Sequence, residues 1–362
     1  MIDFEPSDEQ QMIVETVRQF AQNEVRPHAR SSDETGKLPE SVLAHAHELG
    51  LVANAIEEAS GGGGERSAVT GALVAEELAW GDLSIGLAIL SPSLVALPIQ
   101  DHGSKAQKAE WLPRFTADRF LPGALAIVEP RFDSDPLQPA TRATRAGDEY
   151  ILRGSKCFVP WLEGGESVLV VAAAGETPQG FLVPRSSPGL TATPEQNMGL
   201  QALPTAELVF EDVRVPAEAR LGGEDGSDLS GVLQRGRVAL AATAIGVARA
   251  AFEVARDYAK ERETFGAPIA TRQAIAFKLA DMAIEIDAAR LLVWEAAWKL
   301  DRGADAGRPA VLAQQQSAKL ALEVADGAVQ VLGGHGYTRE YLPEMHLRNA
   351  RGFASFEALA LV

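Results

Sequence analysis

The sequence predicts an α+β protein in which a helical region, a region of strands and a second helical region follow one another. At 362 residues the chain is longer than a single hydrophobic core usually serves, so more than one domain is expected. Both ends of the chain carry apolar side chains at helical spacing, whereas the middle carries short β-branched runs. We therefore predict three domains, at residues 1–122, 123–222 and 223–362.

The N-terminal region shows the start and stop signals of helices. Ser7 followed by Gln10 is typical of a capping box, and apolar side chains then recur on one face until Pro27. A second helix is expected over residues 39–50. Residues 67–82 and 105–115 have the same pattern, so this domain is predicted to be helical throughout.

The middle region has the composition of short strands. Four β-branched runs are bounded by Gly, Pro, Asp and Ser, at 147–159, 167–174, 180–184 and 206–216. No long helix alternates with them, which argues against a nucleotide-binding βαβ fold. We predict a small antiparallel β-barrel or sandwich.

The C-terminal region returns to helices, and these are longer. Within residues 271–300 the apolar side chains advance by three or four positions, at Ile275, Leu279, Met282, Ile286, Ala289, Val293 and Ala297. This spacing is typical of a helix in a bundle.

Composition narrows the possible partners. The formal charge is −17 and no Lys/Arg cluster is present, so a nucleic-acid partner is not expected. The single cysteine, Cys157, excludes an internal disulfide and a thiolate metal cluster, and it reads as a small buried side chain. The acidic N-terminus lacks a signal pattern, and no apolar stretch is expected to span a bilayer. We predict a cytoplasmic protein without a metal or a membrane partner.

Three segments invite a functional interpretation. Glu357 lies in the otherwise uncharged run 352–362, where a carboxylate needs a partner or a task. Residues 330–337 place three glycines within four positions, which either lets the backbone approach a ligand or ends a helix. Arg262 lies near a predicted helix end, where an arginine is by itself most often a solvated surface charge. The residues alone leave these alternatives open.

Taken together, residues 8–27, 258–282 and 330–341 closely resemble the acyl-CoA dehydrogenase family of flavoproteins. The resemblance also includes "HGSKAQKAEWLPRF" and "VFEDVRVP", and it runs from about residue 4 to residue 357. It implies a helical domain, a β-barrel and a four-helix bundle. It also implies FAD as cofactor, an acyl-CoA thioester as substrate, a role in fatty acid or lipid metabolism and re-oxidation by an electron-transfer flavoprotein.

The resemblance assigns cofactor contacts to two groups of residues. One group matches positions that contact the FAD of a neighbouring subunit: Arg262, Thr264, Phe265, Gln273 and the stretch Gln330 to Gly334, which includes Gly333. The other group matches positions around the flavin of the chain's own cleft: Val128, Ser134, Phe158 and Pro160. Arginine suits such a role because its guanidinium binds phosphate oxygens in a bidentate manner.

The resemblance also assigns the catalytic and substrate-binding residues. Glu357 matches the base that removes the α proton of the thioester, while the β hydride goes to flavin N5 and leaves a trans-2-enoyl thioester. A dry pocket would raise the pKa of this carboxyl and make it a better base. Four residues are expected near the substrate: Ser134, Gln234, Arg237 and Ala358. The acyl-pocket floor is expected from the helices around 80–100 and 233–247.

The sequence departs from the family around the chain's own flavin. Val128 and Asp133 replace a usual Thr and Gly, "FVP" (158–160) replaces Trp-Ile-Thr, Ala358-Leu359 replaces Gly-Thr, and the final helix of most relatives is not expected. Three readings follow. The chain is a homo-oligomeric acyl-CoA or acyl-carrier-protein dehydrogenase, a flavin-poor or non-catalytic subunit of a heteromeric dehydrogenase for bulky or steroid side-chain substrates, or a flavin monooxygenase on the same fold.

Overall fold

Helix α1 begins at the predicted capping box. Ser7 Oγ accepts a hydrogen bond from Gln10 N–H, and the Gln10 side-chain oxygen accepts one from Ser7 N–H. The structure, a computed structural model, describes residues 5–362. The N-terminal helices are α1 (Asp8–Phe20), α2 (Ala29–Thr35), α3 (Glu40–Glu48), α4 (Ala68–Gly81), α5 (Leu83–Leu90), α6 (Ser93–His102) and α7 (Lys105–Phe115). The helices predicted over 39–50, 67–82 and 105–115 are thus confirmed as α3, α4 and α7.

The middle of the chain forms one curled seven-stranded sheet. Its strands are β1 (Leu125–Ala126), β2 (Arg142–Ala146), β3 (Glu149–Pro160), β4 (Ser167–Ala174), β5 (Thr177–Pro184), β6 (Leu190–Pro194) and β7 (Thr205–Pro216). The order is β1-β4-β2-β3-β7-β6, and β5 pairs with β4. Most pairs are antiparallel, as predicted, but β1 and β2 each pair with β4 in parallel. The predicted antiparallel barrel is therefore a mixed sheet.

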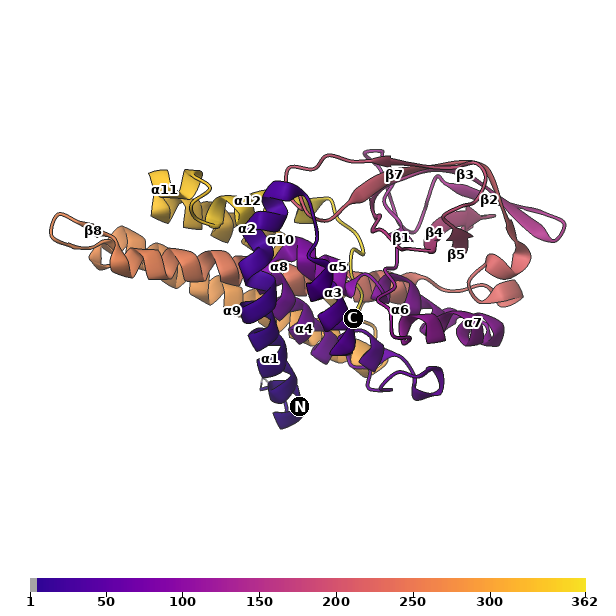
Figure 1. Cartoon of the computed structure of the whole chain (residues 1–362), viewed down its shortest axis with the longest axis horizontal. Coiled ribbons are helices and arrows are strands. Elements are labelled where there is room, and N and C mark those ends of the chain that lie inside the picture. The colour runs from indigo at the N-terminus through magenta and orange to yellow at the C-terminus, as the bar shows by residue number, and fades with distance from the viewer. Residues whose placement is uncertain (1–4) are drawn as a thin grey trace.

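The C-terminal region is a helical bundle (Figure 1). Its elements are α8 (Ser230–Glu261), the hairpin β8 (Glu263–Thr264) and β9 (Ala267–Pro268), α9 (Gln273–Asp301), α10 (Gly307–Leu332), α11 (Gly334–Tyr337) and α12 (Pro343–Arg351). Helices α8, α9, α10 and α12 pack together. The apolar stripe predicted on α9 is confirmed at Met282, Ile286, Ala289, Val293 and Ala297, which are buried, whereas Ile275 and Leu279 are half-buried.

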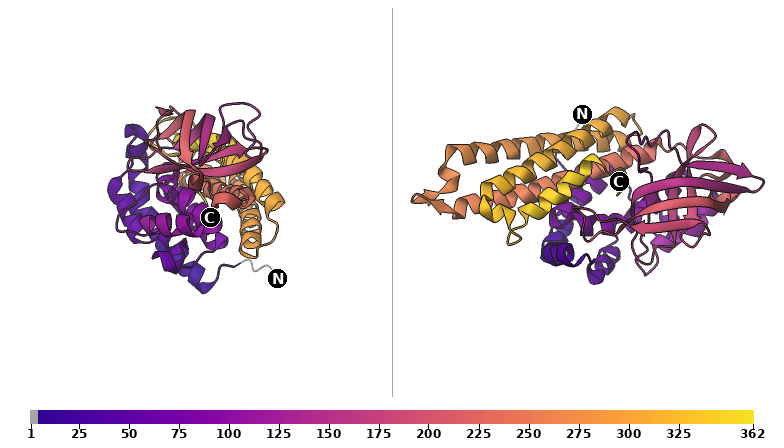
Figure 2. Two further views of the ribbon diagram at one scale, coloured as in Figure 1. Left: turned by 90° about the vertical axis from the view of Figure 1, so that its right-hand side faces the viewer. Right: turned by 90° about the horizontal axis from the view of Figure 1, so that it is seen from above.

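The molecule is elongated, with the sheet at one end and the free end of the bundle at the other (Figure 2). An apolar cluster joins the two parts. It brings Leu94 of α6 together with Leu169 and Leu182 of the sheet, and it also contains Leu233 of α8 and Leu361. The segment that follows α12 therefore returns to the junction between the sheet and the helices.

The sequence analysis expected no apolar stretch long enough to span a bilayer. By length and composition this expectation was wrong. In the described part of the chain, Leu83–His102 and Ser230–Glu261 are helical, long and apolar enough. Within the most apolar window of each stretch, 94% of the first and 78% of the second are buried inside the protein. Both therefore pack as core helices here.

Candidate active site

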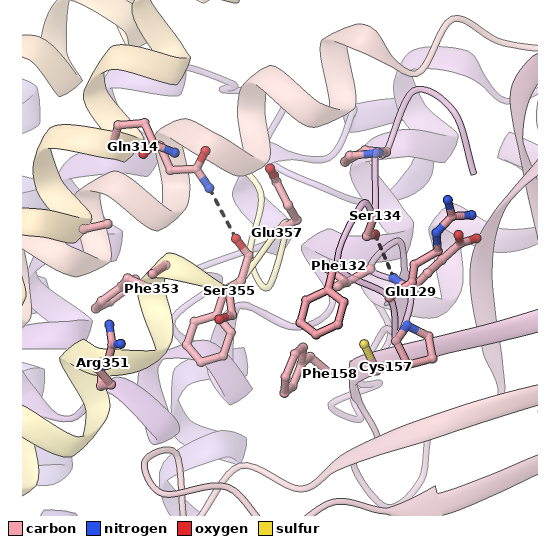
Figure 3. A pocket seen from close by; sticks show the side chains of 18 of the residues that line it. Glu129, Phe132, Ser134, Cys157, Phe158, Gln314, Arg351, Phe353, Ser355 and Glu357 are labelled. Carbon is pink, nitrogen blue, oxygen red and sulfur yellow. Dashed lines mark hydrogen bonds between the residues drawn. The ribbon is translucent and has the colours of Figure 1, made fainter. Parts of the chain in front are cut away.

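A cavity of about 910 Å³ lies between the sheet and the bundle. Its walls come from the loop 128–136, from β3, from α10 and from residues 350–357, which form the end of α12 and the segment after it. Figure 3 shows Glu357, Phe132, Ser134 and Phe158, which line this space, gathered around it. The volume is within the roughly 300–1,000 Å³ that small-molecule and cofactor sites occupy.

Phe158 forms an aromatic wall of the cavity. Its backbone has φ 54°, in the left-handed region, and it lies at an irregularity in the β3–β7 pairing between Lys156 and Val159. The Glu195 carboxylate accepts a hydrogen bond from Phe158 N–H at 3.1 and 3.2 Å, which satisfies a donor that the irregular pairing leaves free. The ring packs edge-on against Phe356, with centroids 6.1 Å apart.

Glu357 lines the cavity next to a half-buried arginine. Arg237 Nη2 of α8 donates to Glu357 Oε1 at 3.2 Å, while Glu357 Oε2 is buried without a hydrogen-bond partner. Burial raises the pKa of the Glu357 carboxyl above its ordinary value, and the Arg237 charge and hydrogen bond only partly oppose this. The site thus holds a carboxylate with one oxygen free to accept a proton.

A buried ion pair supports the wall on the sheet side. Lys156 Nζ is fully buried and donates to Glu129 Oε1 at 3.0 Å and to the Ile127 carbonyl oxygen at 2.9 Å. Burial lowers the pKa of Lys156 to about 8. Glu129 N–H donates to Ser134 Oγ at 3.0 Å, so this pair also fixes the loop that carries Ser134.

Cys157 is buried as predicted, although it lies at the edge of the cavity. Burial raises the pKa of its thiol to about 11, so the thiol stays protonated at neutral pH. Its properties are those of a small packing side chain.

The structure brings four of the predicted site residues to one cavity: Val128, Ser134, Phe158 and Glu357. The lining does not include Pro160, which is buried at the end of β3, nor Gln234 or Ala358. Arg237 does not line the cavity either, and it contacts the site by its hydrogen bond to Glu357.

The remaining predicted cofactor residues lie at the far end of the bundle. Arg262, Thr264 and Phe265 belong to the β8–β9 hairpin, and Phe265 is fully exposed with φ 53°. Gln273 begins α9, and Gln330 to Gly334 end α10 and begin α11. Figure 1 shows this end directed away from the sheet. The two groups therefore cannot contact one ligand within a single copy of the chain.

Several cavity residues escaped the sequence analysis, among them Glu195, Gln314 and Phe132. Glu195 follows β6 and contacts Phe158 across 37 positions of sequence. Gln314 of α10 donates to the Phe356 carbonyl oxygen at 3.3 Å, and Phe132 stands fully exposed in the loop after β1. No local pattern marks Glu195 or Gln314. The aromatic Phe132 in a polar loop was the one available signal.

The described residues, 5–362, contain no group of three or more His, Cys, Asp or Glu side chains arranged to hold a metal ion.

Comparisons with known proteins agree over nearly the whole chain. Family models for the N-terminal, middle and C-terminal domains of acyl-CoA dehydrogenases match residues 7–119, 124–213 and 227–357. A probable acyl-CoA dehydrogenase of Bacillus subtilis is 38% identical over 360 residues, covering 97% of this chain and 94% of that protein.

Solved structures give the same result. Butyryl-CoA dehydrogenase from Megasphaera elsdenii superposes with a TM-score of 0.89 at 33% identity, covering 98% of this chain and 96% of that chain. A glutaryl-CoA dehydrogenase from Mycobacterium smegmatis, described in complex with FADH2, has a TM-score of 0.88 at 30% identity, covering 97% of this chain and 91% of that one.

Proposed function

Because this chain belongs to the acyl-CoA dehydrogenase family of oxidoreductases, we propose that it desaturates an acyl-CoA thioester between the α and β carbons with Glu357 as the base. The observation that carries the proposal is the Glu357 carboxyl, which lies in a cavity with Oε2 buried and free of a hydrogen-bond partner. A group that must take a proton from carbon needs such an unused oxygen in a largely dry site.

The cavity fits a flavin. Its volume suits a large cofactor, and the Phe158 ring offers a flat apolar surface. Val128, Ser134 and Phe158 would contact the bound FAD from within the chain. FAD, when bound, accepts the hydride that leaves the β carbon.

Glu357 and Arg237 prepare the proton transfer. Arg237 Nη2 donates to Oε1, which orients the carboxylate and leaves Oε2 without a hydrogen-bond partner. The α proton passes to Glu357, and the electron pair left on the substrate forms the new double bond as the β hydride departs. The raised pKa of Glu357 strengthens its carboxylate as a base.

The pH profile of kcat/KM tests this arrangement. We expect an acid limb above the ordinary range of glutamate, with activity rising as Glu357 loses its proton. Arg237→Gln removes the influence that lowers the Glu357 pKa, so this variant is expected to move the limb to higher pH. An exposed-residue control, Arg256→Gln, is expected to leave the limb in place. If the acid limb of Arg237→Gln stayed at the same pH as that of the unchanged chain, the pairing of Arg237 with Glu357 would be contradicted.

The exposed end of the bundle is proposed to complete the flavin site of a second copy of the chain. Arg262 N–H donates to the Tyr258 carbonyl oxygen, and Ile269 N–H donates to the Arg262 carbonyl oxygen, both at 2.8 Å. These two hydrogen bonds fix the backbone of Arg262, whose side chain is exposed. Such a group could bind a pyrophosphate through charge-assisted hydrogen bonds.

Substitution of Arg262 tests this assignment. Arg262→Ala is expected to raise the dissociation constant of FAD about 10–100-fold, the effect of losing one hydrogen bond to a charged group. The measurement is the titration of FAD into stripped protein, followed by flavin fluorescence. Arg256→Ala, in the last turns of α8 before Arg262 and paired with Asp257, is the matched control and should bind FAD as the unchanged chain does. Equal FAD affinity in both variants would rule out the role of Arg262.

The proposed reaction is tested directly by enoyl-CoA formation with an artificial electron acceptor. We also propose an electron-transfer flavoprotein as the natural acceptor. The relatives differ in the acyl group that their names state, from short-chain acyl to cyclohex-1-ene-1-carbonyl. These names leave the acyl group of this chain open. A colourless protein that forms no enoyl-CoA would favour the heteromeric-subunit reading, and oxygen-dependent turnover would favour a monooxygenase.

A further inference from the structure

Three aromatic side chains meet near the free end of the bundle and are called the ring cluster below. They are Tyr258 of α8, His335 of α11 and Tyr341, which shortly precedes α12. The rings of His335 and Tyr341 are stacked at 16°, with centroids 5.6 Å apart. The Tyr258 ring stands edge-on to both, at 5.8 Å from His335 and 5.6 Å from Tyr341. All three distances lie in the range that aromatic pairs prefer.

A hydrogen bond adds direction to these ring contacts. Tyr258 Oη and His335 Nδ1 share a hydrogen bond of 2.9 Å, between residues 77 positions apart in the sequence. Both side chains are half-buried, so water competes only partly for the two polar atoms. The bond therefore fixes the end of α8 relative to the short helix α11.

The ring cluster adjoins both parts of the exposed end that were assigned to a flavin. On one side, Arg262 N–H donates to the carbonyl oxygen of Tyr258 itself, at 2.8 Å. On the other side, His335 directly follows the segment Gln330–Gly334. Figure 1 shows α11 and the β8 hairpin, which follows Arg262, at this same end of the bundle.

The third ring connects the cluster to the body of the protein. The Tyr341 carbonyl oxygen accepts a hydrogen bond from Arg30 Nη2 of α2 at 2.7 Å, and Arg30 Nη1 pairs with Glu344 of α12 at 2.6 Å. The side chains of Tyr258 and Tyr341 also pack against the main apolar core. The ring cluster is thus held from two sides and provides a firm support for the exposed loop.

One glycine of this loop is not explained by the fold of a single copy. Gly333 has φ 59°, which favours glycine, and a Cβ at Gly336 would lie 2.4 Å from the Val329 carbonyl oxygen. The backbone of Gly334 is not left-handed, and an added Cβ there would meet no atom of the described chain within 4 Å. The missing side chain at Gly334 therefore leaves space for a group from outside this copy.

Resting on the proposed function, in which Arg262 binds the pyrophosphate of a second copy's FAD, we propose that the ring cluster fixes Arg262 for this contact by tying the end of α8 to the Gln330–Gly334 segment. Tyr258 and His335 are positioning residues in this arrangement, because they act on FAD through Arg262. A preformed site binds more tightly, since little conformational freedom is lost when the ligand arrives.

The test begins with Tyr258→Phe, which removes the hydroxyl group and keeps the ring. FAD is titrated into the stripped full-length chain at one fixed protein concentration, because the proposed site needs two copies. We expect the dissociation constant of FAD to rise about threefold to tenfold, the range for one lost hydrogen bond between neutral groups. Tyr150→Phe, the same change on β3 of the sheet, is the matched control and should leave the dissociation constant unchanged.

A second background separates positioning from general support of the structure. In a chain that already carries Arg262→Ala, adding Tyr258→Phe is expected to change the dissociation constant of FAD by less than about twofold, because the group that it positions is gone. A purely structural role would weaken binding by the same factor in both backgrounds, and that result would overturn the proposal.

Variants of His335 separate the hydrogen bond from the stacked ring. His335→Phe keeps a ring but has no atom to bond with Tyr258, so it should weaken FAD binding as Tyr258→Phe does. His335→Asn places an amide atom where Nδ1 lies and should bind FAD more tightly than His335→Phe. The reverse order would overturn the role of the hydrogen bond. If Tyr258→Phe does not fold, His335→Phe replaces it in both backgrounds.

The outcomes separate this proposal from the proposed function. Weaker FAD binding in Arg262→Ala but not in Tyr258→Phe would reject the ring cluster and leave the role of Arg262 in place. Unchanged FAD binding in Arg262→Ala would reject both. The expected pattern of FAD affinities in a chain that forms no enoyl-CoA would support the ring cluster and reject the proposed reaction.

Discussion

Replacing Glu357 by glutamine is expected to lower kcat/KM for acyl-CoA desaturation by about 10³-fold, within the roughly 10²–10⁴-fold that a positioned general base contributes. The amide has nearly the size of the carboxylate but cannot take up the α proton. Its oxygen can still accept the hydrogen bond from Arg237 that Glu357 Oε1 accepts at 3.2 Å. The loss should therefore fall on proton transfer and leave folding intact.

The measurement is steady-state desaturation with an artificial acceptor, together with the binding of a thioether analogue. Binding of the analogue and FAD content are expected to stay within about threefold, since the substitution removes an interaction of the transition state. Glu323→Gln, an exposed carboxylate on α10, is the matched control. Activity of Glu357→Gln comparable to that of this control would exclude Glu357 as the base.

Replacing Lys156 by methionine is expected to reduce the free energy of unfolding by about 3–5 kcal/mol, the cost of breaking a buried ion pair by removing one partner. Lys156 is fully buried, and Glu129 is 5% exposed, so water cannot replace the lost partner. Burial alone would raise the Glu129 pKa, but the Lys156 charge and the N–H groups of Thr141 and Ala140 outweigh it and lower that pKa. Without Lys156, the buried Glu129 carboxylate would lose its opposite charge and keep only its hydrogen bonds to Thr141 and Ala140.

Urea unfolding followed by circular dichroism measures this effect, in the transition that reports loss of the sheet. Adding Glu129→Gln to Lys156→Met removes the stranded charge, so the double variant is expected to be more stable than Lys156→Met alone. Lys278→Met, at an exposed position of α9, controls for the substitution itself. A loss below about 1 kcal/mol in Lys156→Met would contradict the assignment, because surface pairs contribute no more than that.

Local features were predictable because short stretches of chain decide them. The capping box at Ser7 and Gln10 and the apolar spacing of α9 depend on residues three or four positions apart, and both were found as expected. The strands β3, β4 and β7 carried enough β-branched residues to be recognised. The short strands β1, β2 and β6 did not, because their existence depends on the strands beside them.

The sequence by itself therefore determined the order of helical and β regions, the family and the candidate base Glu357. The tertiary structure alone decided what surrounds that base. Arg237 lies 120 positions from Glu357, Glu195 lies 37 positions from Phe158, and Leu361 lies 268 positions from Ser93. Such contacts form because burial of apolar surface brings distant elements together, and buried polar groups must then find partners across that interface. No local pattern encodes which partner each group finds.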